Sequence, residues 1–100
     1  MNDTYYSISS LAMDLKRVAL GYHAGSYKTA KRFSQEALKR KSEIDTENIK
    51  PYLQKLLQTL PKILEQQDVG RVAEDALMYS TLFQNYAVTH MVSSKTKYRE

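Results

Sequence analysis

The chain offers few side chains of the kinds that catalyse reactions or bind metal ions. It has no cysteine and only two histidines, His23 and His90. Neither histidine has another histidine, a cysteine or an acid at the spacing of a metal site. Glu74 and Asp75 are adjacent, so on a helix they point about 100° apart and do not form a pair of catalytic acids. The sequence therefore predicts no metal and no cofactor.

One pair of residues could act on a phosphodiester. Arg17 and His23 would supply a cation for a phosphate and a group that moves a proton. Their spacing resembles the ribonuclease motif of HEPN domains, which implies a dimeric helical bundle directed at RNA. However, Val18 is apolar where that family has a polar residue, and Gly21 is expected to end the helix inside the motif. An HEPN-like module is kept as an alternative, and the protein is predicted not to be an enzyme.

The composition predicts long helices that position these residues. The chain has 100 residues, of which 42% are apolar and 26% charged, with Gly 3 and Pro 2. So few turn-forming residues argue against a β-sandwich or barrel. The N-terminus lacks the features of a secretory signal, and no apolar run approaches the ~18 residues of a membrane span. A cytoplasmic protein is expected.

Four segments carry apolar residues at the period of a helix. The predicted inward faces are Ile8, Leu11, Ala12, Leu15, Val18, Ala19 and Tyr22; then Tyr27, Ala30, Phe33, Ala37, Leu38 and Ile44; then Ile49, Tyr52, Leu53, Leu56, Leu57, Leu60, Ile63 and Leu64; and finally Val72, Ala73, Ala76, Leu77, Ser80, Phe83, Ala87 and Met91. Asp14 is predicted to lie outside the inward face of the first helix. Pro61 is expected to kink the third helix without ending it. We predict an all-α antiparallel four-helix bundle, up-down-up-down, as one domain over residues 1–92, followed by a flexible basic C-terminal tail over residues 93–100.

Two groups of apolar residues fall outside these faces. Tyr6, Met13 and Leu20 repeat every seven residues on the first helix, and Met78, Leu82 and Tyr86 lie on the fourth. Tyrosine and methionine are enriched at protein interfaces. The two groups either contact a partner or are covered by the bundle itself.

The second helix carries a basic ridge, Lys28, Lys31 and Lys39. Several cations on this helix, Lys39 included, are expected to have local partners: Arg32 and Arg40 with Glu36, and Lys39 with Glu43. The favoured interpretation is a solvated face, followed by contact with a protein or a membrane surface. A nucleic-acid-binding bundle is the least favoured, because Tyr27 and Phe33 are assigned to the core and cannot stack on bases.

The chain as a whole resembles the bacteriocin immunity proteins of Gram-positive bacteria, of the class II type. The resemblance lies in the helix spacing, the turn EIDTEN before the helix PYLQKLLQTL, and the basic tail SSKTKYRE. It implies a small basic interaction protein that acts from the cytosol on a membrane permease with bound bacteriocin. Peripheral membrane proximity and a homodimer are further alternatives.

The same resemblance implies that the C-terminal part selects the peptide. The partner-binding residues that it implies are Met78, Leu82, Tyr86, Lys95, Lys97, Tyr98 and Arg99.

Overall fold

In a computed structural model the protein is all-helical. The structure describes the backbone of residues 3–96 and the side chains of residues 4–47 and 49–89. Its elements are α1 (Asp3–His23), α2 (Tyr27–Ser42), the short 3₁₀ helix η1 (Thr46–Asn48), α3 (Pro51–Leu64) and α4 (Val69–Thr96). Residues 3–96 contain no strand. The predicted all-α fold is confirmed.

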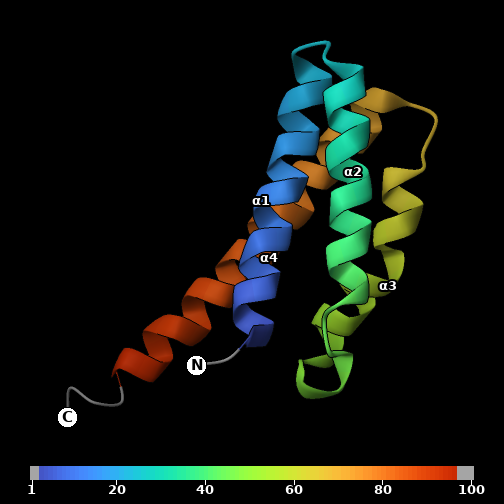
Figure 1. The fold of residues 1–100 in the computed structure, drawn as a ribbon. Coiled ribbons are helices and arrows are strands. Elements are labelled where there is room, and N and C mark those ends of the chain that lie inside the picture. The colour runs from blue at the N-terminus through green and yellow to red at the C-terminus, as the bar shows by residue number, and fades with distance from the viewer. Residues whose placement is uncertain (1–2, 97–100) are drawn as a thin grey trace.

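The helices pack as a bundle in which each contacts two others. α1 packs against α2 and α4, and α3 packs against the same two helices. In Figure 1, the α1–α2 turn and the α3–α4 link lie at one end of the bundle and the α2–α3 link lies at the other. α4 is the longest helix, and its last turns extend past the other three.

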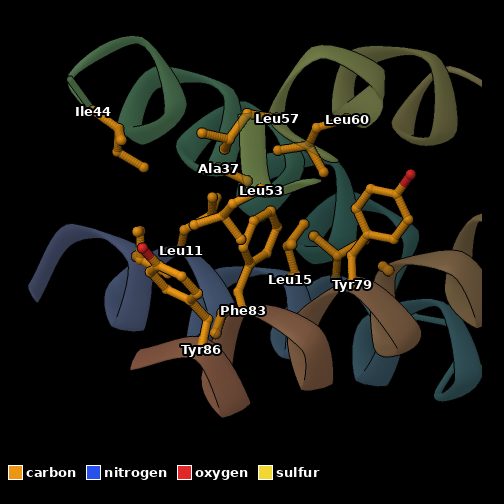
Figure 2. Packing of buried hydrophobic residues seen from close by; sticks show 14 of the residues in the cluster. Leu11, Leu15, Ala37, Ile44, Leu53, Leu57, Leu60, Tyr79, Phe83 and Tyr86 are labelled. Atoms are coloured by element: carbon orange, nitrogen blue, oxygen red, sulfur yellow. The ribbon is translucent and has the colours of Figure 1, made fainter. Parts of the chain in front are cut away.

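One hydrophobic core lies between the four helices (Figure 2). Its largest fully buried side chains are Phe83, Ile8, Leu11, Leu15, Leu53, Leu57, Leu60, Val18 and Val72. The predicted inward faces supply all of them. Ser80 is a buried polar residue on the α4 face, and its hydroxyl donates to the Ala12 carbonyl oxygen at 2.7 Å, which joins α4 to α1.

The turn between α1 and α2 corrects the expectation for Gly21. The glycine does not end α1, which continues to His23. Gly25 is the residue with positive φ, +77°, and the amides of Gly25 and Ser26 donate to the carbonyls of Tyr22 and Gly21 at 3.2 and 2.8 Å. This is the Schellman arrangement of a helix C-terminus. Gly21 instead lets α2 approach, because a Cβ there would lie 3.0 Å from the Cβ of Ala30.

Five aromatic or apolar residues lie differently from their predicted positions. Tyr27, Tyr52 and Leu77 are predicted core residues but are exposed by 48%, 51% and 44%. Tyr79, which the sequence assigned to no face, and Tyr86, assigned to an outer face, are both buried. Tyr79 and Tyr86 are buried because α4 packs against α3 as well as α1, so its buried arc is wider on the α3 side than the apolar stripe indicates. Met91 lies outside the residues with described side chains.

Asp14 is the second correction of the predicted pattern. Its side chain is buried, although the sequence placed it off the apolar face. Arg40 of α2 donates from Nε to Asp14 Oδ2 at 3.1 Å, and Arg17 Nη1 lies 3.8 Å from Oδ1. Burial of the carboxylate is tolerated because it is paired and hydrogen-bonded.

The end of α4 lies within the segment predicted to be a flexible tail. The helical backbone continues past residue 92 to Thr96. Residues 97–100 lie outside the described part of the chain. No helix within residues 3–96 combines the length and the apolar character needed to cross a lipid bilayer.

Candidate functional site

The main candidate for a functional site is a groove between α1 and α4, with a volume of about 410 Å³. It is lined by Ala12, Met13 and Lys16 from α1 and by Leu77, Ser80, Thr81, Gln84 and Asn85 from α4. Lys16 is the only charged side chain among these lining residues. We call this feature the α1–α4 groove.

Met13 and Leu77, two large apolar side chains that line the α1–α4 groove, remain in solvent, and the same two helices expose further apolar residues. Met13 is 51% exposed, and Tyr6 and Leu20, seven residues to either side of it on α1, are 71% and 56% exposed. On α4, Leu77 and Val88 are each 44% exposed. The spacing of Leu77, Thr81, Gln84 and Val88 places them along one side of α4. A groove lined by exposed apolar side chains from two helices is typical of an interaction site.

Only one of the two predicted apolar groups is exposed throughout. All three members of the α1 row, Tyr6, Met13 and Leu20, are on the surface. On α4, Met78 is 52% exposed and Leu82 is partly buried. Neither lines the α1–α4 groove, so the groove is a different site from the one that the resemblance implies on α4. Leu77 and Val88 are the α4 residues that sequence reasoning missed as surface groups. The sequence did contain a signal for this. Leu77, Thr81, Gln84 and Val88 are spaced i, i+4, i+7 and i+11 and so share one side of the helix, and two of the four are polar.

Tyr86 does not lie on the outer surface that its predicted role requires. Its side chain is 5% exposed, and its ring centroid lies 5.8 Å from that of Tyr5 and 6.2 Å from that of Tyr52. Burial, and next the neighbouring Tyr5, raise the pKa of Tyr86 above its ordinary value of 10.0, although a backbone hydrogen bond at Lys50 acts in the opposite direction. Tyr86 is a core residue that joins α4 to α1 and α3.

The remaining predicted partner-binding residues lie near the C-terminus. Lys95 is within α4, but its side chain is outside the described residues. Lys97, Tyr98 and Arg99 lie outside the described part of the chain altogether. These four positions stay predictions.

Arg17 and His23 lie on one unbroken helix and differ in their surroundings. The guanidinium of Arg17 lies over the Phe33 ring, 5.4 Å from its centroid, and pairs with Asp14. His23 is exposed in the last turn of α1. Six residues place the two side chains about 120° apart around the helix. Arg17 therefore faces α2, and the geometry gives no support to a joint action of the pair on a phosphate. The side chain of His90 is outside the described residues.

The basic ridge of Lys28, Lys31 and Lys39 is exposed along α2. Among the described residues, no ion pair within 4.0 Å joins Arg32 or Arg40 to Glu36, or Lys39 to Glu43; Arg40 pairs with Asp14 instead. Arg40 reaches α1 instead of Glu36, since the buried carboxylate of Asp14 is a stronger partner than an exposed one. The charges of α2 are therefore less neutralised locally than the sequence indicated.

A second groove of about 490 Å³ lies beside α2 and is lined in part by Tyr22, Lys31, Ser34 and Leu38. The Ser34 hydroxyl is buried there without a hydrogen-bond partner. Among the described residues, no three side chains of the metal-binding types are grouped as a metal ion requires.

Comparison with known proteins assigns this chain to no family. No family model, curated protein or solved structure matches it. The function is therefore argued from the arrangement of the residues.

Proposed function

We propose that the protein is a small non-enzymatic interaction protein that binds its partner through the α1–α4 groove. The observation that carries this proposal is the joint position of Met13 and Leu77, two large exposed apolar side chains from different helices that line one groove. When a partner covers a half-exposed apolar side chain, apolar surface is removed from water, and this lowers the free energy of the complex. The lining has one charge, so a partner would desolvate few charged groups on binding.

The biological role that we propose is immunity to a bacteriocin of the class II type. The protein would act in the cytoplasm on a membrane permease that has bound the bacteriocin. The resemblance of the helix spacing, the EIDTEN turn and the basic tail to immunity proteins supports this role. The exposed cations of α2 support it further, since a membrane surface rich in anionic lipids attracts them.

The proposal takes the bundle to run up-down-up-down, with α3 kinked at Pro61. The alternation of the helix connections between the two ends in Figure 1 supports the first feature. The second is supported by the position of Pro61 inside α3, where it cannot donate a backbone hydrogen bond to the Leu57 carbonyl. A crystal structure with a straight axis through Pro61 would contradict the kink.

Expression in a bacteriocin-sensitive strain tests the role directly. Cells that produce the chain are expected to survive at least one member of a panel of class II peptides that kills cells with the empty vector. Unchanged killing by every peptide would contradict the immunity role. A chain with Leu53→Asp, which places a charge in the core, serves as the unfolded control.

A further inference from the structure

The dimensions of the α1 row indicate what kind of partner segment fits it. Tyr6, Met13 and Leu20 are seven residues apart, so they repeat about every 10.5 Å along α1. A second helix presents side chains on one face at the same heptad interval. An extended strand presents them about every 6.8 Å and falls out of step with the row. The row therefore matches a helix of about four turns, because Tyr6 and Leu20 are roughly 21 Å apart along the axis.

The charge of the groove argues against a second copy of this chain. A two-fold pairing through this face would bring two Lys16 side chains into one interface, because such a pairing places the same residues on both sides. The lining of the groove contains no acid to pair with them.

We infer that the α1–α4 groove binds one amphipathic helix of a partner protein, and that this helix carries an acidic residue opposite Lys16. Its apolar face covers Met13 and Leu77, and its carboxylate pairs with the Lys16 ammonium at the edge of the groove. Thr81, Gln84 and Asn85 supply hydrogen bonds to its polar flank. This inference rests on the proposed interaction through the groove, and it names the partner by its chemistry.

Two synthetic peptides test the inference with the intact chain. Both have 18 residues, form a helix and carry leucines along one face; they differ at a single position at the edge of that face, which is Glu in one and Lys in the other. Isothermal titration calorimetry is expected to show that the Glu peptide binds about tenfold more tightly than the Lys peptide. The variant Lys16→Glu is expected to invert this preference. No binding of either peptide, or a preference that Lys16→Glu leaves unchanged, would overturn the inference.

Two methionines of equal exposure locate the binding site. Met13 lines the α1–α4 groove and is 51% exposed, whereas Met78 is outside its lining and is 52% exposed. Met13→Glu is expected to abolish binding of the Glu peptide, and Met78→Glu is expected to leave it within about twofold of the parent chain. Equal effects of the two substitutions would overturn the position that we assign. Circular dichroism confirms that each variant is folded.

Sedimentation equilibrium and the killing assay separate the remaining outcomes. A dimer that Met13→Glu dissociates would assign the groove to a second copy and overturn the helix inference. Peptide binding in a chain that gives no protection would support the helix inference and contradict the immunity role alone. Protection that survives both Lys16→Glu and Met13→Glu would leave immunity standing and overturn the role of the groove.

Discussion

Arg40 Nε lies 3.1 Å from Asp14 Oδ2 and so joins α2 to α1 through a charged hydrogen bond between residues 26 positions apart. The Asp14 side chain is 7% exposed and that of Arg40 is 34% exposed. The carboxylate is therefore shielded from water, while the guanidinium remains partly hydrated. The pair fixes the position of α2 against α1 on the side where Arg17 also approaches Asp14.

Arg40→Met is expected to destabilise the fold by about 1–2 kcal/mol, because the buried Asp14 then loses its close hydrogen-bond donor. Methionine keeps an apolar stem of similar length, so the loss reports on the charge and the hydrogen bond. Lys39→Met is the matched control, since Lys39 is the exposed neighbour, and its effect is expected to stay within about 0.5 kcal/mol. Urea unfolding measures both values. Equal effects of the two substitutions would show that Arg40 does not stabilise Asp14.

Gly21→Ala is expected to destabilise the protein, although alanine ordinarily favours a helix over glycine by about 1 kcal/mol. The new Cβ would lie 3.0 Å from Ala30 Cβ and 3.1 Å from the Cα and N atoms of Ala30. Backbone atoms cannot move aside as a flexible side chain can, so α2 must shift, at a cost of about 1–3 kcal/mol.

Gly70→Ala is the control for this substitution. Its new Cβ would meet only the Asp68 carboxylate, at 3.3 Å. The melting temperature of Gly70→Ala is expected to stay close to that of the parent, and that of Gly21→Ala to fall. A higher melting temperature for Gly21→Ala would contradict the close approach of α1 and α2.

Tyr86→Phe is expected to reduce the sensitivity of the fold to alkali. Burial, and then the neighbouring Tyr5, raise the pKa of Tyr86 in the folded protein above 10.0. As the pH rises above about 10, the unfolded chain releases a proton that the folded chain retains, so the free energy of unfolding falls. This contribution is fully present below pH 10 and is absent from Tyr86→Phe. Denaturant titrations between about pH 8 and 11 measure the two slopes. Identical slopes would show that Tyr86 is not buried as described.

The helices and most of the core could be predicted from the sequence because the apolar residues recur at the helical period. Leu11, Leu53 and Phe83 are all buried as their positions predict. The period determines the direction in which each side chain points around the axis of its helix. It does not determine how much of the helix surface the neighbouring helices cover. Tyr79 and Tyr86 are buried because α3 covers the flank of α4 on which they lie.

The candidate site could be predicted only in part for the same reason. The exposed row of Tyr6, Met13 and Leu20 follows from a heptad interval within one helix. Met13 of this row meets Leu77 and Lys16 in one groove, and this depends on how α1 and α4 pack, which cannot be predicted from the residue spacing within a single helix. The pairing of Asp14 with Arg40 is likewise a contact between helices, and sequence spacing indicated Glu36 as the partner of Arg40.

The most direct test of the central claim compares Met13→Glu with Met78→Glu in the killing assay. Both substitutions place a carboxylate on an exposed methionine site of nearly equal exposure, 51% and 52%, but only Met13 lines the α1–α4 groove. In a sensitive strain that the parent chain protects, Met13→Glu is expected to lose protection at a level of folded protein equal to the parent, and Met78→Glu is expected to keep it. Loss of protection in Met78→Glu with full protection in Met13→Glu would contradict the account and place the interaction on the other flank of α4.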